Sequence, residues 1–259
     1  MAKLLNIAAN SLKGRNFTVM TGKVMRRFSE RGNESQKQTI TAWCKQHQEP
    51  LEPFLKNLDP ALFEETEKTC TQIKQKAQQK LSALGMDLGG GGNYPLLYFF
   101  TRYLKPQNIL ETGVAAGWSS QAILTALKTN DQNAHLYSSD FPYFRYKNPE
   151  KLVGYIVDDS LKTNWTLMID GDENNIPALL KALKPGKIDL FHYDSDKSYA
   201  GRENAYKAVQ PALNKNALII YDDIQDNAHF MDWVAKENRP FKVFEFEGKY
   251  IGLTGTIPA

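Results

Sequence analysis

The sequence predicts an α/β fold: a mostly parallel sheet with helices on both faces and an antiparallel hairpin at the carboxyl end. From residue 107 onward, short apolar runs alternate with helical segments, which is the pattern of strand–helix units. Several of the apolar runs end at an acid, as at Asp140, Asp194 and Asp222. The tail then forms two apolar runs around a tight Glu247–Gly248–Lys249 turn. Because ligands bind at the carboxyl ends of parallel strands, these acids mark the expected site.

Composition limits the class of protein. A chain of 259 residues suits one large α/β domain, or one domain with a smaller cap. The net charge of +3 and the scattered Arg and Lys residues argue against a nucleic-acid partner. No apolar stretch approaches the roughly 18 residues of a membrane span, so no membrane partner is expected. The two cysteines, Cys44 and Cys70, lack metal-ligand spacing, which favours free thiols and a cytoplasmic location.

The amino-terminal segment is basic. Its first 29 residues contain six basic side chains and no acid. This bias is typical of an organelle transit segment or of an arm that lies on a membrane surface. The apolar positions form no sustained amphipathic stripe, so we favour the simpler interpretation of a partly ordered arm.

Residues 1–85 are predicted to form this arm and a helical cap, and residues 86–259 the main domain. A short helix is expected near residues 36–47. A longer one follows Asp59, which can cap it, and stops at Gly85. One face of the longer helix is apolar at helical spacing and therefore buried. The cap is interpreted as a covering or oligomerisation layer, and a homodimer is expected.

A glycine-rich loop joins the two parts. Gly89 to Gly92 are four consecutive glycines, which hold neither a helix nor a strand well. The loop is either a flexible linker or a lid whose backbone approaches a ligand. The apolar segment 95–104 after it predicts a helix.

The main domain then alternates between strands and helices. Strands are predicted at 108–112, 134–140, 165–170, 187–194 and 216–223. Helices are predicted between and after them at 119–128, 176–184, 203–213 and 227–237.

The turn after the first strand, "ILETGVAAGWSS" at 109–120, opens a helix. Gly113 and Gly117 leave room for a ligand near the backbone, with the helix amino terminus behind them. Their spacing is not G-x-G-x-x-G, so a dinucleotide site loses its main support. Asp140, at the end of the second strand, can accept hydrogen bonds from both hydroxyls of a ribose. The segment "DGDE" at 170–173 lies where an adenine amino group would be met.

The fourth and fifth strands end in carboxylates. Asp194 and Asp196 flank one serine, Lys197 follows them, and Asp222–Asp223 end the next strand. Such groups are costly to desolvate unless they are paired or bound to a cation, so the pattern predicts a metal and catalytic site. Two simpler interpretations remain open. Asp194 or Asp196 could cap the following helix, and Lys197 could only pair with Asp196.

These motifs together resemble the class I S-adenosylmethionine-dependent methyltransferases. More narrowly they resemble the cation-dependent O-methyltransferases that act on catechols, caffeoyl-type phenols and some sugar hydroxyls. The similarity covers roughly residues 86–256 and implies a Rossmann-like sheet. It also implies S-adenosylmethionine as cofactor, Mg²⁺ or another divalent cation, and a small-molecule acceptor with neighbouring hydroxyls.

The resemblance assigns a role to each site residue. The residues that would contact the cofactor are Glu111, Gly113, Gly117 and Ser119 around the methionine, Asp140 at the ribose, Asp172 near the adenine, and Asp194. The metal ligands would be Asp194, Asp222 and Asp223, and the catalytic residues Lys197 and Asp194. The family commonly has Asp-Asn where this chain has Asp222–Asp223.

In the implied reaction the cation lowers the pKa of a coordinated hydroxyl, and Lys197, with a pKa lowered by desolvation, accepts the proton. Two alternatives differ in class. One is a metal-independent methyltransferase that uses Lys197 or Asp196, and the other is a non-catalytic cofactor-binding protein that acts through its helical cap. The aromatic segment 140–155 forms either a wall of the ligand site or a surface insertion.

Overall fold

The computed structural model describes residues 6–7, 10, 21, 34–130 and 133–257. Most of the basic amino-terminal segment therefore lies outside the described residues. Among the residues that are described, no helix is both long and apolar enough to span a membrane.

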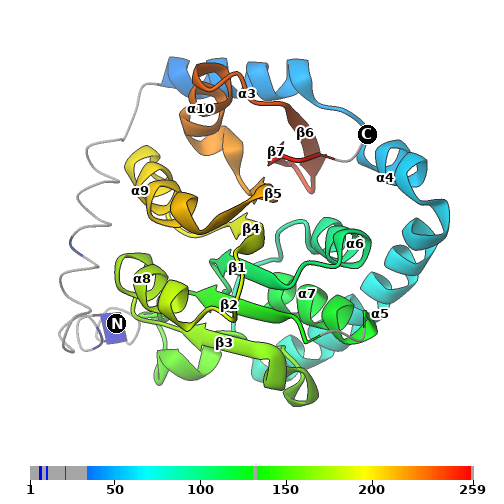
Figure 1. Ribbon diagram of the computed structural model, residues 1–259. Helices are drawn as coiled ribbons and strands as arrows, with labels where there is room; N and C mark the ends of the chain where they lie inside the picture. The colour runs from blue at the N-terminus through cyan, green and yellow to red at the C-terminus, as the bar shows by residue number, and fades with distance from the viewer. Residues whose placement is uncertain (1–5, 8–9, 11–20, 22–33, 131–132, 258–259) are drawn as a thin grey trace.

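A seven-stranded sheet runs through the molecule in the order β3-β2-β1-β4-β5-β7-β6 (Figure 1). The first five strands pair in parallel, and β7 pairs antiparallel with β5 and β6, so the predicted fold class is confirmed. The strand bounds are β1 Asn108–Thr112, β2 His135–Ser139, β3 Trp165–Met168, β4 Ile188–Tyr193, β5 Leu213–Tyr221, β6 Phe241–Phe246 and β7 Lys249–Gly255.

Helices cover both faces of the sheet. Helices α6 and α7 lie on one side, and α8, α9 and α10 on the other (Figure 1). Their bounds are α6 Tyr94–Leu104, α7 Trp118–Thr129, α8 Asp172–Ala182, α9 Tyr199–Val209 and α10 His229–Lys236. Short 3-10 helices fill the connections: η1 Pro149–Leu152, η2 Asp159–Asn164, η3 Gln210–Ala212 and η4 Ile224–Asp226.

The amino-terminal helices are α3 (Glu34–His47), α4 (Leu51–Leu58) and α5 (Pro60–Leu84). The predicted signals at the ends of α5 are confirmed: the Asp59 carboxylate accepts the Leu62 N–H at 2.9 Å, and Gly85 ends the helix with φ 65°. Helix α4, eight residues long, was not predicted. These helices wrap the outside of the sheet and its helices, from α3 beside α10 to α5 beside α6 and α7 (Figure 1).

The amino-terminal helices share the core of the main domain. Cys44 of α3 lies in one hydrophobic cluster with Phe191 and Ile219 of the sheet. Leu62 of α5 lies in another with Leu190 of β4. The predicted division at residue 85 stays a prediction.

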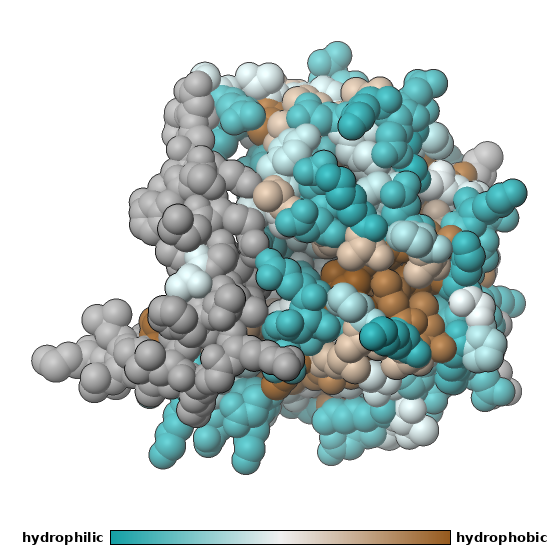
Figure 2. Space-filling model, turned by 60° about the vertical axis from the view of Figure 1, so that its left-hand side comes forward, coloured by the Kyte–Doolittle hydropathy of each residue, from teal (hydrophilic) through white to brown (hydrophobic). Residues whose placement is uncertain are grey.

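Both cysteine thiols are free and buried, as predicted. Burial raises the pKa of Cys44 and of Cys70 to about 12, so both remain protonated thiols near neutral pH. Polar residues cover most of the described surface in Figure 2, and a group of hydrophobic residues is exposed near its centre.

Candidate active site

The carboxyl ends of the parallel strands bring the predicted site residues to one edge of the sheet. The Asp194 N–H donates to the Thr112 carbonyl of β1 at 2.8 Å, and the Asp222 N–H donates to the Tyr193 carbonyl of β4 at 2.9 Å. Each acid therefore follows the last residue of its strand and is held to the neighbouring strand by a backbone hydrogen bond. Gly113, Asp194 and Asp222 follow neighbouring strands and lie together, as the sequence indicated.

The glycine turn is shaped by its contacts with the protein. Gly113 has φ 86°, and a β-carbon built on it would lie 2.3 Å from the Asp194 carbonyl oxygen. Gly117 has φ 103°, and its β-carbon would lie 3.0 Å from Cα of Gly154. Glycine is required at both positions because another backbone segment approaches closely. The backbone of Asp194 thus takes the space beside Gly113 that the sequence analysis assigned to a ligand.

Asp140 joins the second strand to the glycine turn. Its Oδ2 accepts the Ala115 N–H and its Oδ1 accepts the Phe141 N–H, both at 2.6 Å. The carboxylate is partly exposed and lies beside the amino-terminal end of α7, where Ser119 is buried in the first turn. Each of these carboxylate oxygens therefore bonds a backbone N–H, which orients the side chain beside the glycine turn.

Asp172 links three elements at the same edge. It is the first residue of α8, and its Oδ1 accepts the Ser139 hydroxyl at 2.6 Å. Its other oxygen accepts the hydroxyl of Ser195, which directly follows Asp194. Asp172 therefore connects the end of β2 to the end of β4. Sequence reasoning missed Ser195, which lies between two acids that dominated the motif.

Glu111 is fully buried below this edge. Its Oε2 accepts hydroxyl groups from Ser120 at 2.6 Å and Ser138 at 2.7 Å, and its Oε1 lies 3.8 Å from Nδ1 of His192. Burial acts to raise the pKa of Glu111, but His192 and the serine hydroxyls outweigh it and lower the pKa. All of its surface is covered by protein, so contact with a cofactor stays a prediction that this arrangement does not support directly.

His192 lies between two carboxylates. Its Nε2 is 3.3 Å from Oδ2 of Asp222, on the side opposite Glu111. Burial would lower the pKa of this histidine, but the two acids raise it to about 10. His192 is thus a buried imidazolium near neutral pH that neutralises part of the charge of both acids.

Lys197 pairs with two of the predicted metal ligands. Its Nζ donates to Oδ1 of Asp194 and lies 2.8 Å from Oδ2 of Asp223. Lys249 of β7 also reaches Asp223, with its Nζ 3.1 Å from Oδ1. Burial acts to lower the pKa of Lys197, but Asp194 and Asp223 outweigh it, so the pKa is raised. The predicted lowering is therefore wrong.

The carboxyl groups respond to the same charges. Burial raises the pKa of Asp194 to about 6, against the opposing effect of Lys197. For Asp223, Lys197 and Lys249 outweigh burial and lower the pKa.

Asp196 bonds a different part of the chain from these acids. Its Oδ1 accepts the Ser198 N–H at 3.1 Å, at the start of α9. The simpler interpretation paired Lys197 with Asp196, whereas the structure pairs it with Asp194 and Asp223.

Comparison with known proteins adds the decisive observation. Residues 110–224 match a protein family described as methyltransferase domain. This part of the chain is therefore similar to a methyltransferase domain. The match covers β1 to the start of η4 and so includes each acid at the sheet edge. A search of curated protein sequences finds no match.

Several solved structures share the fold of this chain. An O-methyltransferase from Bacillus cereus in complex with S-adenosylhomocysteine (SAH) has a TM-score of 0.55 at 12% identity, over 71% of this chain and 90% of its own. TomG, an O-methyltransferase of tomaymycin synthesis from Streptomyces achromogenes in complex with SAM, has a TM-score of 0.56 at 14% identity, over 72% and 90%. A methyltransferase from Geobacter sulfurreducens has a TM-score of 0.52 at 14% identity, over 72% and 89%. At these identities the likeness shows the fold alone.

The predicted metal ligands are not arranged as a metal site. Within the described part of the chain, no group of three or more His, Cys, Asp or Glu side chains could hold a metal ion. Asp194 and Asp223 face lysine ammonium groups, and Asp222 faces His192. The residues present therefore do not fit a divalent cation in this arrangement.

Arg202 of α9 supports the acidic pair and was missed in the sequence. It is completely buried, and its Nη2 donates to the carbonyl oxygens of Asp222 at 2.9 Å and Asp223 at 2.8 Å. The guanidinium lies 5.6 Å from the ring centres of Tyr193 and Tyr221. It fixes the backbone at Asp223, whose φ of 53° is left-handed. No local pattern marks this residue, because its partners come 20 residues later.

The glycine-rich loop belongs to the same region. A β-carbon on Gly91 would lie 2.8 Å from the side chain of Trp118, and one on Gly92 would lie 1.9 Å from Oδ2 of Asp222. The hydroxyl groups of Tyr143 and Tyr146 donate to the carbonyls of Leu88 at 2.8 Å and Asp87 at 2.7 Å. Hydrogen bonds therefore join the glycine-rich loop to the aromatic segment 140–155, and the loop lies against Asp222.

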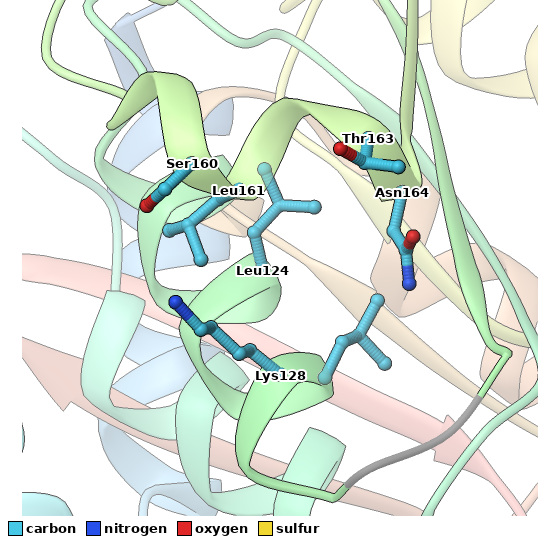
Figure 3. Close-up of a pocket in the computed structure, with 7 residues that line it drawn as sticks. Leu124, Lys128, Ser160, Leu161, Thr163 and Asn164 are labelled. Carbon is cyan, nitrogen blue, oxygen red and sulfur yellow. The ribbon is translucent and has the colours of Figure 1, made fainter.

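A separate cavity of about 200 Å³ lies between α7 and η2 (Figure 3). Leu124, Leu127 and Lys128 line it from the last two turns of α7, and no carboxylate contributes. Because α7 begins at the glycine turn, this cavity is at the opposite end of the helix from the acids. It offers no group for methyl transfer.

Proposed function

We propose that the chain is an S-adenosylmethionine-dependent O-methyltransferase that acts on a hydroxyl group of a small molecule. The observation that carries the proposal is the meeting of the glycine turn, Asp140, Asp194 and Lys197 at one edge of a methyltransferase domain. Two structural neighbours, an O-methyltransferase in complex with SAH and another in complex with SAM, support the choice of cofactor and of oxygen as acceptor atom.

The cofactor would supply a methyl group activated on a sulfonium. Asp140 is placed for the ribose hydroxyls, since it lies against the glycine turn through Ala115. The first turn of α7, with Ser119, faces the same turn with its free N–H groups and positive end. Asp172, with Ser139 and Ser195, would border the site on the side of α8.

In the transfer a C–O bond forms on the acceptor, the C–S bond of the sulfonium breaks to release the thioether product, and the hydroxyl proton passes to solvent water. The acceptor oxygen gains nucleophilicity as it loses the proton, so a nearby positive charge lowers the barrier. Lys197 is placed to supply that charge as an ammonium group, since Asp194 and Asp223 keep it protonated. We assign Lys197 this electrostatic role, and Asp194 the role of holding it in position.

Cofactor binding tests the proposal most directly. We expect calorimetric titration to show binding of S-adenosylmethionine to the wild type, and at least tenfold weaker binding to Asp140→Ala. Tenfold corresponds to about 1.4 kcal/mol, within the range for a lost charge-assisted hydrogen bond. Asp159→Ala is the matched control, because the Asp159 side chain is 94% exposed in η2, away from the glycine turn. Absence of binding to the wild type would refute the proposal.

Transfer to oxygen is measured with the same protein. We expect radiolabelled methyl groups to pass to a hydroxylated acceptor from a panel of catechols, phenols and sugars, with loss of turnover in Lys197→Met. The divalent cation implied by the resemblance is checked by adding EDTA to this assay. Labelling of amine acceptors only would contradict the assignment to oxygen.

A further inference from the structure

Each predicted metal ligand already faces a positive group. Asp194 bonds Lys197, and Asp223 lies between Lys197 and Lys249, at 2.8 Å and 3.1 Å. Asp222 lies 3.3 Å from Nε2 of His192. A divalent cation would have to displace these partners and would be repelled by them.

Two of the three acids are also largely buried. The side chains of Asp222 and Asp223 are only 5% and 9% exposed. Gly92 lies directly against the Asp222 carboxylate, where even a methyl group would not fit. Magnesium requires near-octahedral oxygen ligands and usually keeps several waters, whereas the ammonium groups of Lys197 and Lys249 already lie against Asp223.

The backbone oxygens are occupied as well. The carbonyl groups of Asp222 and Asp223 both accept hydrogen bonds from Nη2 of Arg202. The side-chain and backbone oxygens of the acidic pair therefore already bond positive side chains.

The departure from the family pattern explains this arrangement. The resembled family commonly has Asn where this chain has Asp223, so the chain carries one more negative charge at this point. Lys249, beside the turn of the terminal hairpin, pairs with that added carboxylate. The hairpin thus supplies the compensating charge from the protein itself.

We propose that Lys197 and Lys249 take the place of the divalent cation, so that this enzyme transfers methyl groups without metal. This inference rests on the proposed function and specifies how its site handles charge. Lys197 lies between Asp194 and Asp223 and would face the acceptor oxygen, and Lys249 balances the second charge of the acidic pair. A single hydroxyl on the acceptor then suffices, because no chelation by two neighbouring oxygens is needed.

Binding of Mn²⁺ tests the inference without reference to activity. In electron paramagnetic resonance titrations of EDTA-stripped protein, we expect the wild type to leave Mn²⁺ free. We expect Lys249→Met, and more strongly Lys249→Met with Lys197→Met, to bind Mn²⁺ at concentrations at which the wild type leaves it free. Lys242→Met is the matched control, since Lys242 lies on the same hairpin but pairs with Glu49 at 2.7 Å; it should bind no Mn²⁺.

Activity gives the second readout. We expect wild-type turnover to change less than twofold on addition of EDTA, and a phenol with one hydroxyl to be methylated as well as a catechol. Tight binding of Mn²⁺ by the wild type, or loss of turnover with EDTA and its recovery with Mg²⁺, would overturn the inference and leave the proposed function standing. Failure to bind S-adenosylmethionine would instead refute the proposed function, while the Mn²⁺ titration would still decide the inference.

Discussion

Gly92 lies directly against the carboxylate of Asp222: a β-carbon built on Gly92 would fall 1.9 Å from Oδ2 of that side chain. The glycine-rich loop is therefore part of the active-site wall. Gly92 does not have a positive φ, so its lack of a side chain is required by contact and not by backbone conformation. This distinction makes the contact testable.

Gly92→Ala is expected to force the loop or the Asp222 carboxylate to move. Overpacking of a tight contact costs typically about 1–3 kcal/mol, so we expect a corresponding loss in the free energy of unfolding measured with urea, and reduced methyl transfer. Gly90→Ala is the control in the same loop, because nothing lies within 4 Å of its β-carbon. Equal behaviour of the two variants would show that the loop does not contact Asp222 in solution.

His192→Phe is expected to destabilise the fold strongly. The substitution leaves Glu111 and Asp222 without the cation between them, and removal of one partner from a buried ion pair costs about 3–5 kcal/mol. His135→Phe provides the comparison, since His135 is part-buried and its ring bonds the neutral Thr166 hydroxyl at 2.8 Å. A loss of about 1 kcal/mol is expected there. Chemical denaturation at pH 7 measures both, and equal losses would contradict the ion-pair role of His192.

The sequence predicted the sheet well because its signals are local. Each parallel strand is a short apolar run that ends at an acid or a glycine turn, and each following helix has its own periodicity. The Asp59 cap and the Gly85 stop were read from single positions. Helix α4 was not predicted because it has only eight residues and contains Pro53. Proline usually interrupts a helix, but it is tolerated here because Pro53 lies within the first turn.

The charge balance of the site could not be predicted in the same way. Lys249 comes 26 residues after Asp223, and only the return of the hairpin beside β5 brings the two together. The pKa of Lys197 was predicted with the wrong sign because desolvation was considered without the charge of Asp223, which arrives from the next strand. The pairing of each acid with a lysine or histidine depends on tertiary contacts, and no periodic pattern in the sequence marks such contacts.

Ser195→Ala is expected to weaken cofactor binding with little effect on stability. The Ser195 hydroxyl donates to Asp172, which also accepts from Ser139, so its removal loosens the connection between α8 and the end of β4. Loss of one hydrogen bond of about 0.5–1.5 kcal/mol predicts a roughly three- to tenfold rise in the Kd for S-adenosylmethionine, measured by calorimetry. Ser160→Ala, in the cavity at the other end of α7, is the control. An unchanged Kd in Ser195→Ala would show that Asp172 needs no such support.

His229 makes stability depend on pH in acid solution. Its ring is buried among Tyr199, Tyr221 and Trp233, and burial lowers its pKa from 6.5 to about 4. Between these two values the unfolded chain binds a proton that the folded chain does not. The contribution of His229 is therefore fully present above pH 6.5 and is lost as the pH falls toward 4, by about 3 kcal/mol in all. Urea denaturation of the wild type and of His229→Phe at several pH values measures it. The difference in unfolding free energy between the two proteins should narrow or reverse by that amount across this window, and a difference that stays constant would show that His229 is not buried in its neutral form.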